Sequence, residues 1–183
     1  PGMALAWIDG HLDLASVAVG GRDVLAPADG VTGCISIPDL ASSEVRVVLG
    51  TIFTAPIDDR GDYGACGYVD VDSAAAAGLR QLQVYRQLES DGHLRMQHEG
   101  LDLPAAGEPL SLVLMMEGAD PIRDAEDVAT WRTYGLRVVG LTWSSGTRYA
   151  GGNSSGGGLS NAGRDLVAAL DESGIVHDAS HCS

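Results

Sequence analysis

Side chains that could bind a metal ion occur at the ends of apolar segments in this sequence. Four such residues stand out: His11, Asp13, Glu117 and His181. The first two are two positions apart, so on an extended segment they point to the same side. Imidazole nitrogen and carboxylate oxygen are ligands that suit zinc. The pattern predicts a metal site, although for the first pair alone a turn with an exposed histidine and aspartate is the alternative.

Parallel strands would bring these four residues together from distant parts of the chain. Apolar and β-branched runs predict five strands, over residues 3–8, 45–54, 110–116, 136–143 and 175–180. Helical spacing and capping residues predict helices over 74–90, 124–134 and 160–172. The run over 110–116 is apolar at nearly every position, which is typical of a strand covered on both faces. The alternation of strands and helices predicts an α/β fold built from parallel βαβ units.

Two α/β architectures fit this alternation, a (β/α)8 barrel of the TIM type and a doubly wound sheet. The barrel is favoured because barrel enzymes carry their chemical groups at the carboxyl ends of several strands, which meet at one mouth. Only about five βα units are present, whereas a complete barrel needs about 250 residues. We therefore expect residues 1–183 to form one domain that is a partial barrel.

Composition excludes several classes of partner. The chain has 183 residues, 45% of them hydrophobic, and a net charge of −14, which disfavours binding to nucleic acids and to anionic membranes. No apolar run reaches the roughly 18–20 residues of a transmembrane segment, and no signal peptide is apparent. Three widely spaced cysteines without a CxxC pair argue against a zinc ribbon and favour free thiols. These features predict a cytoplasmic protein with no membrane segment.

Seven short segments carry a resemblance to a known family. They are 8–14 (IDGHLDL), 36–40 (SIPDL), 116–118 (MEG), 134–137 (YGLR), 141–142 (LT), 158–164 (GLSNAGR) and 178–181 (DASH). In this order they resemble motifs of the renal (membrane) dipeptidase family of zinc metallopeptidases, peptidase family M19, whose fold is an amidohydrolase-like barrel. The matches cover nearly the whole chain, but they correspond to the first part of the family domain only.

The resemblance implies a site with two zinc ions. His11 and Asp13 would bind the first ion, Glu117 would bridge both, and His181 would bind the second. A bridging carboxylate offsets the repulsion between two nearby cations, and a metal-bound hydroxide would attack the amide carbonyl. The function implied is a zinc-dependent hydrolase that cleaves dipeptides or similar small amides.

The sequence departs from the family pattern at one position near the substrate. Trp143 stands where the family has a histidine, and an indole can neither accept a proton nor bind a metal. Either the substrate differs, with Trp143 contacting it, or another group such as Arg148 assists the oxyanion. The alternative function is a metal-binding but catalytically impaired barrel fragment that serves as a binding or assembly module.

The resemblance also implies functional residues that these 183 residues do not contain. A further histidine for the second metal, and an arginine and an aspartate for substrate recognition, lie further along the family pattern. A partial barrel leaves unpaired strand edges, which favour aggregation unless other strands cover them. We therefore expect residues 1–183 to be the first part of a longer barrel protein; if they are the whole chain, we expect a homo-oligomer, or a second chain that completes the barrel.

Overall fold

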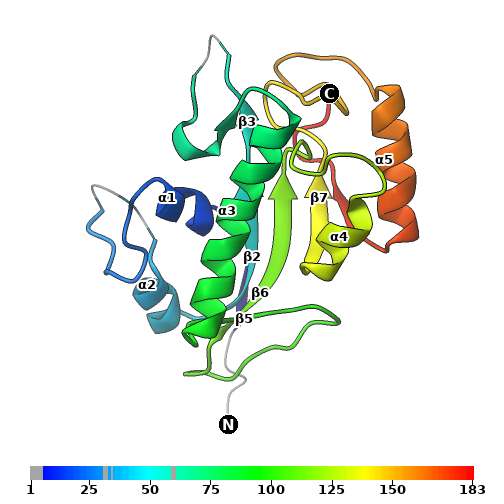
Figure 1. Ribbon diagram of the computed structural model, residues 1–183. Coiled ribbons are helices and arrows are strands. Elements are labelled where there is room, and N and C mark those ends of the chain that lie inside the picture. Colours follow the sequence, from blue (N-terminus) through cyan, green and yellow to red (C-terminus); the bar gives the residue numbers. More distant parts are fainter. Residues whose placement is uncertain (1–5, 31–32, 34, 59–60) are drawn as a thin grey trace.

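The computed structural model describes residues 6–30, 33, 35–58 and 61–183. Its strands are β1 (Trp7–Leu12), β2 (Val45–Phe53), β3 (Ala55–Pro56), β4 (Gly67–Tyr68), β5 (Leu94–Met96), β6 (Leu110–Glu117), β7 (Leu136–Gly140) and β8 (Val176–Asp178). Its helices are α1 (Leu14–Val19), α2 (Ile37–Ser42), α3 (Val71–Ser90), α4 (Val128–Thr133) and α5 (Asn161–Glu172), with a short 3₁₀ helix, η1 (Gly64–Cys66). Strands and helices alternate along most of the chain, as the sequence predicts (Figure 1).

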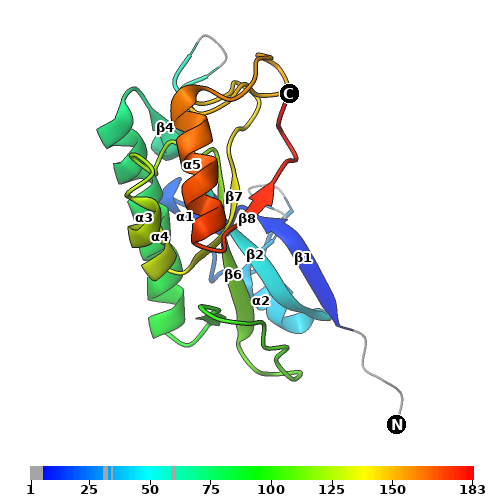
Figure 2. The same cartoon turned by 90° about the vertical axis from the view of Figure 1, so that its right-hand side faces the viewer.

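The main sheet is parallel throughout and follows chain order. Its strands lie in the order β1-β2-β6-β7-β8, and the short β5 pairs with the beginning of β6. A doubly wound sheet would reverse its strand order at a switch point, and this order does not reverse. Figure 2 shows α1, α3, α4 and α5 on one side of the sheet, whereas β1 and β8 border the opposite, open side. The fold is thus half of a (β/α)8 barrel, and the prediction of a partial barrel is confirmed.

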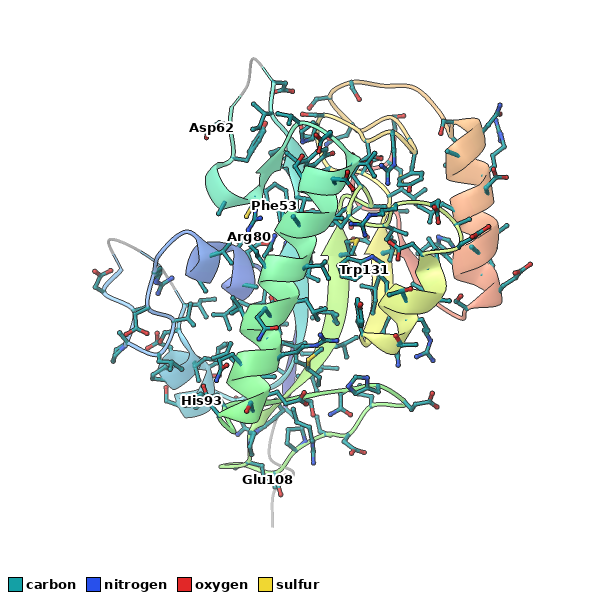
Figure 3. The ribbon with its side chains drawn as sticks, viewed as in Figure 1. Phe53, Asp62, Arg80, His93, Glu108 and Trp131 are labelled. Carbon is teal, nitrogen blue, oxygen red and sulfur yellow. The ribbon has the colours of Figure 1, made fainter. Side chains whose placement is uncertain are left out.

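Side-chain alternation along β6 explains how one strand serves both the core and the open face. Leu112, Leu114 and Met116 point toward the helices and belong to the hydrophobic core. That core includes Trp131 of α4, labelled in Figure 3, which is 2% exposed. The intervening residues face the other way, and Glu117 is the last of them. The strand therefore anchors itself with one set of side chains and presents a carboxylate with the other.

Helix capping sets where two long helices begin. Ser160 caps α5 by accepting a hydrogen bond from the backbone N–H of Gly163, in agreement with the prediction. For α3, the predicted start at residue 74 is wrong, because Asp70 and Ser73 form a capping box that starts the helix at Val71. The helix predicted over 124–134 is also shorter than expected, since turns occupy the chain before Val128.

The first strand differs most from expectation. It was predicted over 3–8 as a buried segment; residues 3–5 lie outside the described part of the chain, and β1 continues through His11 to Leu12. Trp7 and Ile8 are 58% and 55% exposed, so the predicted burial is wrong. The reason is topological: β1 pairs with β2 alone among the described strands, and its inner side faces the open surface of the half-barrel.

Two further predictions from composition can be compared with the structure. Cys66 and Cys182 are free thiols, as expected, while Cys34 lies outside the described residues. In the described part of the chain, no helix combines the length and the apolar character needed to cross a membrane.

Candidate metal centre

The four predicted metal ligands come from three strands whose carboxyl ends lie at one rim of the sheet. His11 is near the end of β1, Asp13 immediately precedes α1, and Glu117 ends β6. His181 lies in the turn that follows β8. Because all these strands are parallel, their carboxyl ends meet at the same rim, and residues separated by up to 170 positions become neighbours.

Glu117 lies between the two histidines. Its Oε1 is 3.0 Å from Nε2 of His181, and its Oε2 is 3.8 Å from Nε2 of His11. Nε2 of His11 is also 3.3 Å from Oδ2 of Asp13. One donor atom each from His11, Asp13 and Glu117 can be chosen so that all lie within 4.8 Å of one another. Each carboxylate oxygen of Glu117 therefore faces a different imidazole.

The electrostatics of the cluster favour a bound cation. Glu117 is only 5% exposed, and burial raises the pKa of its carboxyl group against the opposing effect of the two histidines. The hydrogen bond with Asp13 raises the pKa of His11, with burial acting in the opposite direction. A buried carboxylate is costly unless positive charge compensates it. A divalent cation held by these side chains would provide that compensation.

The backbone around Glu117 is tightly fixed. The carbonyl oxygen of Glu117 accepts a hydrogen bond from the N–H of Thr54, and the N–H of Gly118 donates to the carbonyl oxygen of Gly140. Gly118 has a φ of +82°, and a Cβ there would lie 2.7 Å from the carbonyl oxygen of Thr54. The residue after Glu117 must therefore be glycine for the strand to end in this conformation.

The two ring nitrogens of His181 have different surroundings. Nδ1 is buried and has no hydrogen-bond partner among the described residues, whereas Nε2 faces the buried carboxylate of Glu117. The position of the residue is fixed through its backbone, because the hydroxyl of Thr142 donates to its carbonyl oxygen at 2.9 Å. A histidine with one unpaired buried nitrogen and the other facing a carboxylate fits the ligand chemistry of zinc.

Trp143 lies in the loop after β7 and contacts two other aromatic rings. Its ring centroid is 5.1 Å from that of Phe53 and 5.6 Å from that of Tyr63. All three rings are partly exposed. The predicted role of Trp143 in substrate binding stays a prediction, and the structure surrounds it with apolar partners.

The structure places Arg148 in a different network. Its Nε lies 3.6 Å from Oδ1 of Asp120, and its guanidinium donates to the carbonyl oxygens of Asp120 and Ile122. The hydroxyl of Tyr68 donates to Oδ2 of the same aspartate, which is 5% exposed. The predicted assistance to an oxyanion stays a prediction, since these contacts already engage the guanidinium.

Sequence reasoning missed one acidic residue that matters here. Asp120 carried no local signal, because its partners Tyr68 and Arg148 are 52 and 28 positions away. Asp178, in contrast, belongs to the segment 178–181 that resembles a family motif. It lies at the end of β8, and its charge raises the pKa values of both His11 and Glu117.

Comparisons with solved structures agree with this architecture. A metallo peptidase from Rhodobacter sphaeroides, liganded with a phosphinate mimic of the dipeptide L-Ala-D-Ala, aligns with a TM-score of 0.79 at 19% identity over 98% of this chain and 60% of its own. Dipeptidase AC, a metallo peptidase of family M19, gives 0.75 at 20% identity over 97% and 57%. The probable dipeptidase PvdM from Pseudomonas aeruginosa gives 0.76 at 18% identity over 98% and 47%. At these identities the likeness shows the shared fold, and the chain spans about half to three fifths of the length of these structures.

Comparison with curated proteins finds no match. A family model, in contrast, matches residues 3–183, which is nearly the whole chain. Together with the half-barrel and the rim on which the four candidate ligands meet, this match assigns the chain to the membrane dipeptidase family, peptidase family M19.

Proposed function

We propose that this chain supplies the first part of a zinc-dependent hydrolase that cleaves dipeptides or similar small amides. The observation that carries the proposal is the position of Glu117, whose two carboxylate oxygens lie 3.0 and 3.8 Å from the imidazoles of His181 and His11. These contacts join residues from three strands at the rim where barrel enzymes carry their active sites. Membership of the membrane dipeptidase family supports the same conclusion.

The proposed ligands divide between two ions. His11 and Asp13 would hold one, His181 would hold the other, and Glu117 would contribute an oxygen to each. Bound zinc would supply a hydroxide near neutral pH and polarise a carbonyl group. The chain's own contribution is to exclude water around the buried Glu117 and to hold His181 through the hydrogen bond from the Thr142 hydroxyl to its carbonyl oxygen.

A dipeptide-like substrate is proposed because of the molecules that related structures bind. The Rhodobacter sphaeroides metallo peptidase holds a phosphinate mimic of L-Ala-D-Ala. An amide of this size would fit an open rim that carries metal ligands on one side and the aromatic rings of Phe53, Tyr63 and Trp143 on the other.

Hydrolysis assays test the proposal directly. The full chain, loaded with zinc, is assayed on a panel of dipeptides with and without a chelator. We expect turnover that the chelator abolishes and that added zinc restores. We also expect His11→Ala and Asp13→Ala to lower the zinc content measured by elemental analysis, and unchanged zinc in both variants would refute the ligand assignment.

A second candidate function is a metal-binding module without turnover. Trp143 favours it, because an indole replaces the family histidine near the substrate. Stoichiometric zinc without hydrolysis of any substrate in the panel would select this candidate over the enzyme.

We further propose one domain over residues 1–183, a cytoplasmic location, and a partner, either a second copy or another chain, that packs against the border strands β1 and β8. The exposed apolar residues Ile8 and Val176, on the two border strands, support such a partner because they are 55% and 61% exposed. Light scattering at several protein concentrations would test it; a monomer at every concentration would exclude the homo-oligomer.

A further inference from the structure

Three aromatic side chains form a compact cluster beside the candidate metal centre. The ring centroids of Phe53 and Trp143 are 5.1 Å apart, those of Tyr63 and Trp143 are 5.6 Å apart, and those of Phe53 and Tyr63 are 6.4 Å apart. The interplanar angles lie between 79° and 88°, so every pair packs edge to face. We call these three residues the aromatic cluster.

Strand register places the aromatic cluster next to Glu117. Phe53 is the Cα partner of Glu117 on β2, and Gly140 is its partner on β7. Paired residues of neighbouring parallel strands point to the same face of a sheet, so Phe53 projects on the side of the Glu117 carboxylate. Trp143 follows Gly140 by three residues, and its ring packs edge to face against the ring of Phe53. The cluster therefore forms a wall of the same rim that holds the candidate metal ligands.

The backbones of Phe53 and Trp143 are fixed by separate hydrogen bonds. Gln81 of α3 clamps Phe53, accepting from its N–H at 3.0 Å and donating to its carbonyl oxygen at 2.6 Å. The carbonyl oxygen of Trp143 accepts from the N–H of Gly146 at 3.3 Å. A cluster held at separate points is preorganised and loses little freedom when a ligand binds.

Tyr63 adopts an unusual backbone conformation. Its φ is +54°, and it is the only residue other than glycine with a positive φ among the described residues. Such a conformation costs free energy and persists where the surroundings enforce it, often at binding sites. Here the strained residue brings its ring against Trp143 and Phe53.

Exposure separates the aromatic cluster from the hydrophobic core. The core aromatics Tyr85 and Trp131 are 0% and 2% exposed, whereas each ring of the cluster remains partly exposed. We propose that the aromatic cluster is a subsite that binds an apolar side chain of the substrate. This inference rests on the proposed function and specifies its substrate class: dipeptides that carry an aromatic or large aliphatic side chain.

The chemistry of the cluster explains this choice. Where the family carries a histidine, Trp143 offers a broad apolar face and a single N–H donor. Aromatic rings bind apolar side chains by excluding water and by edge-to-face contacts. A small side chain such as alanine would leave most of this surface in water, and an anionic one would lose hydration without gaining a cationic partner from the cluster.

Binding of phosphinate dipeptide mimics tests the proposal without requiring turnover. Three probes are compared on the zinc-loaded full chain: the Ala-Ala mimic, and mimics with phenylalanine in the first or the second position. We expect one of the phenylalanine mimics to bind at least about tenfold more tightly than the Ala-Ala mimic, which corresponds to about 1.4 kcal/mol. Calorimetry gives the dissociation constants.

Variants assign that preference to the aromatic cluster. We expect Trp143→Ala to remove the preference by weakening the binding of the phenylalanine mimics much more than that of the Ala-Ala mimic. Tyr63→Gly is the second variant, because glycine accepts the positive φ and so keeps the loop conformation while removing one ring. Trp7→Ala is the matched control, since Trp7 is 58% exposed and lies outside the cluster; it should leave the preference unchanged.

The outcomes separate this inference from the proposed function. Binding of all three mimics with equal affinity, or a preference that survives both Trp143→Ala and Tyr63→Gly, would overturn the subsite and leave the metal centre intact. Failure of the zinc-loaded wild type to bind any of the mimics would overturn the proposed function, and the subsite with it.

Discussion

Glu117 and Asp120 are three positions apart and equally buried, yet their surroundings differ completely. Each is 5% exposed, and burial raises the pKa of each carboxyl group. Asp120 is enclosed by donors of the protein: the Tyr68 hydroxyl, the backbone N–H of Arg148 at 3.2 Å and the Arg148 guanidinium. Glu117 instead faces imidazole nitrogens, which can bind a cation as readily as they can carry a proton.

This difference distinguishes a structural carboxylate from a ligand. Strong donors that stay protonated satisfy Asp120 permanently and tie together the segments around residues 68, 120 and 148. The imidazoles beside Glu117 satisfy it only when the facing ring nitrogen carries a proton, or when a metal ion lies between them and the carboxylate. Burial and pKa direction alone would rank the two residues as equals, so the type of partner is the property that identifies the site.

The largest expected effect concerns zinc affinity. Glu117→Gln removes the charge shared by both proposed ions, and we expect the zinc affinity to fall by more than about a hundredfold, because even residues that only support ligands cost ten- to a hundredfold. Asp120→Asn, the matched control, should leave zinc affinity unchanged. Calorimetric titration of the metal-free chain measures both, and equal losses in the two variants would abolish the distinction.

The next effect concerns folding. Asp120→Ala leaves the Tyr68 hydroxyl without its acceptor and the partly buried Arg148 guanidinium without its carboxylate partner, so we expect the free energy of unfolding to fall by about 3 kcal/mol. Urea denaturation of the metal-free chain measures it. Under the same conditions Glu117→Gln should be neutral or stabilising, because it removes a buried charge. A greater loss in Glu117→Gln than in Asp120→Ala would reverse the assigned roles.

The sequence predicts much of the candidate site because strand ends carry it. The apolar run before Glu117 marks β6, and parallel strands must bring their carboxyl ends together, so residue type and position suffice to group His11, Glu117 and His181. The helix capped by Ser160 is likewise a local property and was predicted. The segments that resemble family motifs occur in the same order along the chain, and they support the same grouping.

The remaining features depend on contacts that no local pattern reports. The three-residue β5 was missed because it is too short to show periodicity, and β1 was misjudged because its exposure depends on having one neighbouring strand. The network around Asp120 joins residues up to 52 positions apart. The aromatic cluster similarly joins Phe53 to Trp143 across 90 positions, so only the folded chain reveals it.

A smaller effect on stability is expected when the hydrogen bond from the Tyr68 hydroxyl to Asp120 is removed. Tyr68→Phe keeps the ring, which is 7% exposed, and removes the donor to Asp120. We expect the free energy of unfolding to fall by about 1 to 2 kcal/mol, since Arg148 still compensates the carboxylate. A double-mutant cycle with Asp120→Asn isolates the coupling; additive losses would mean that the two side chains contribute independently.

The smallest effect is the pH dependence of the stability that Asp120 contributes. Burial raises the pKa of Asp120 in the folded state, against the Tyr68 hydrogen bond and the charge of Arg148, so the folded chain holds this proton more tightly than the unfolded chain does. The contribution of the group is then fully present below the unfolded pKa of 3.8 and is lost as the pH rises through the folded pKa.

We expect Asp120→Asn to lower the free energy of unfolding more at pH 4 than at pH 7, as measured by urea denaturation of the metal-free proteins. Because other groups titrate alike in both proteins, the difference isolates Asp120. A penalty that grows with pH would mean that Tyr68 and Arg148 outweigh the cost of burial, and Asp120 would then differ from Glu117 in its intrinsic charge state as well as in its partners.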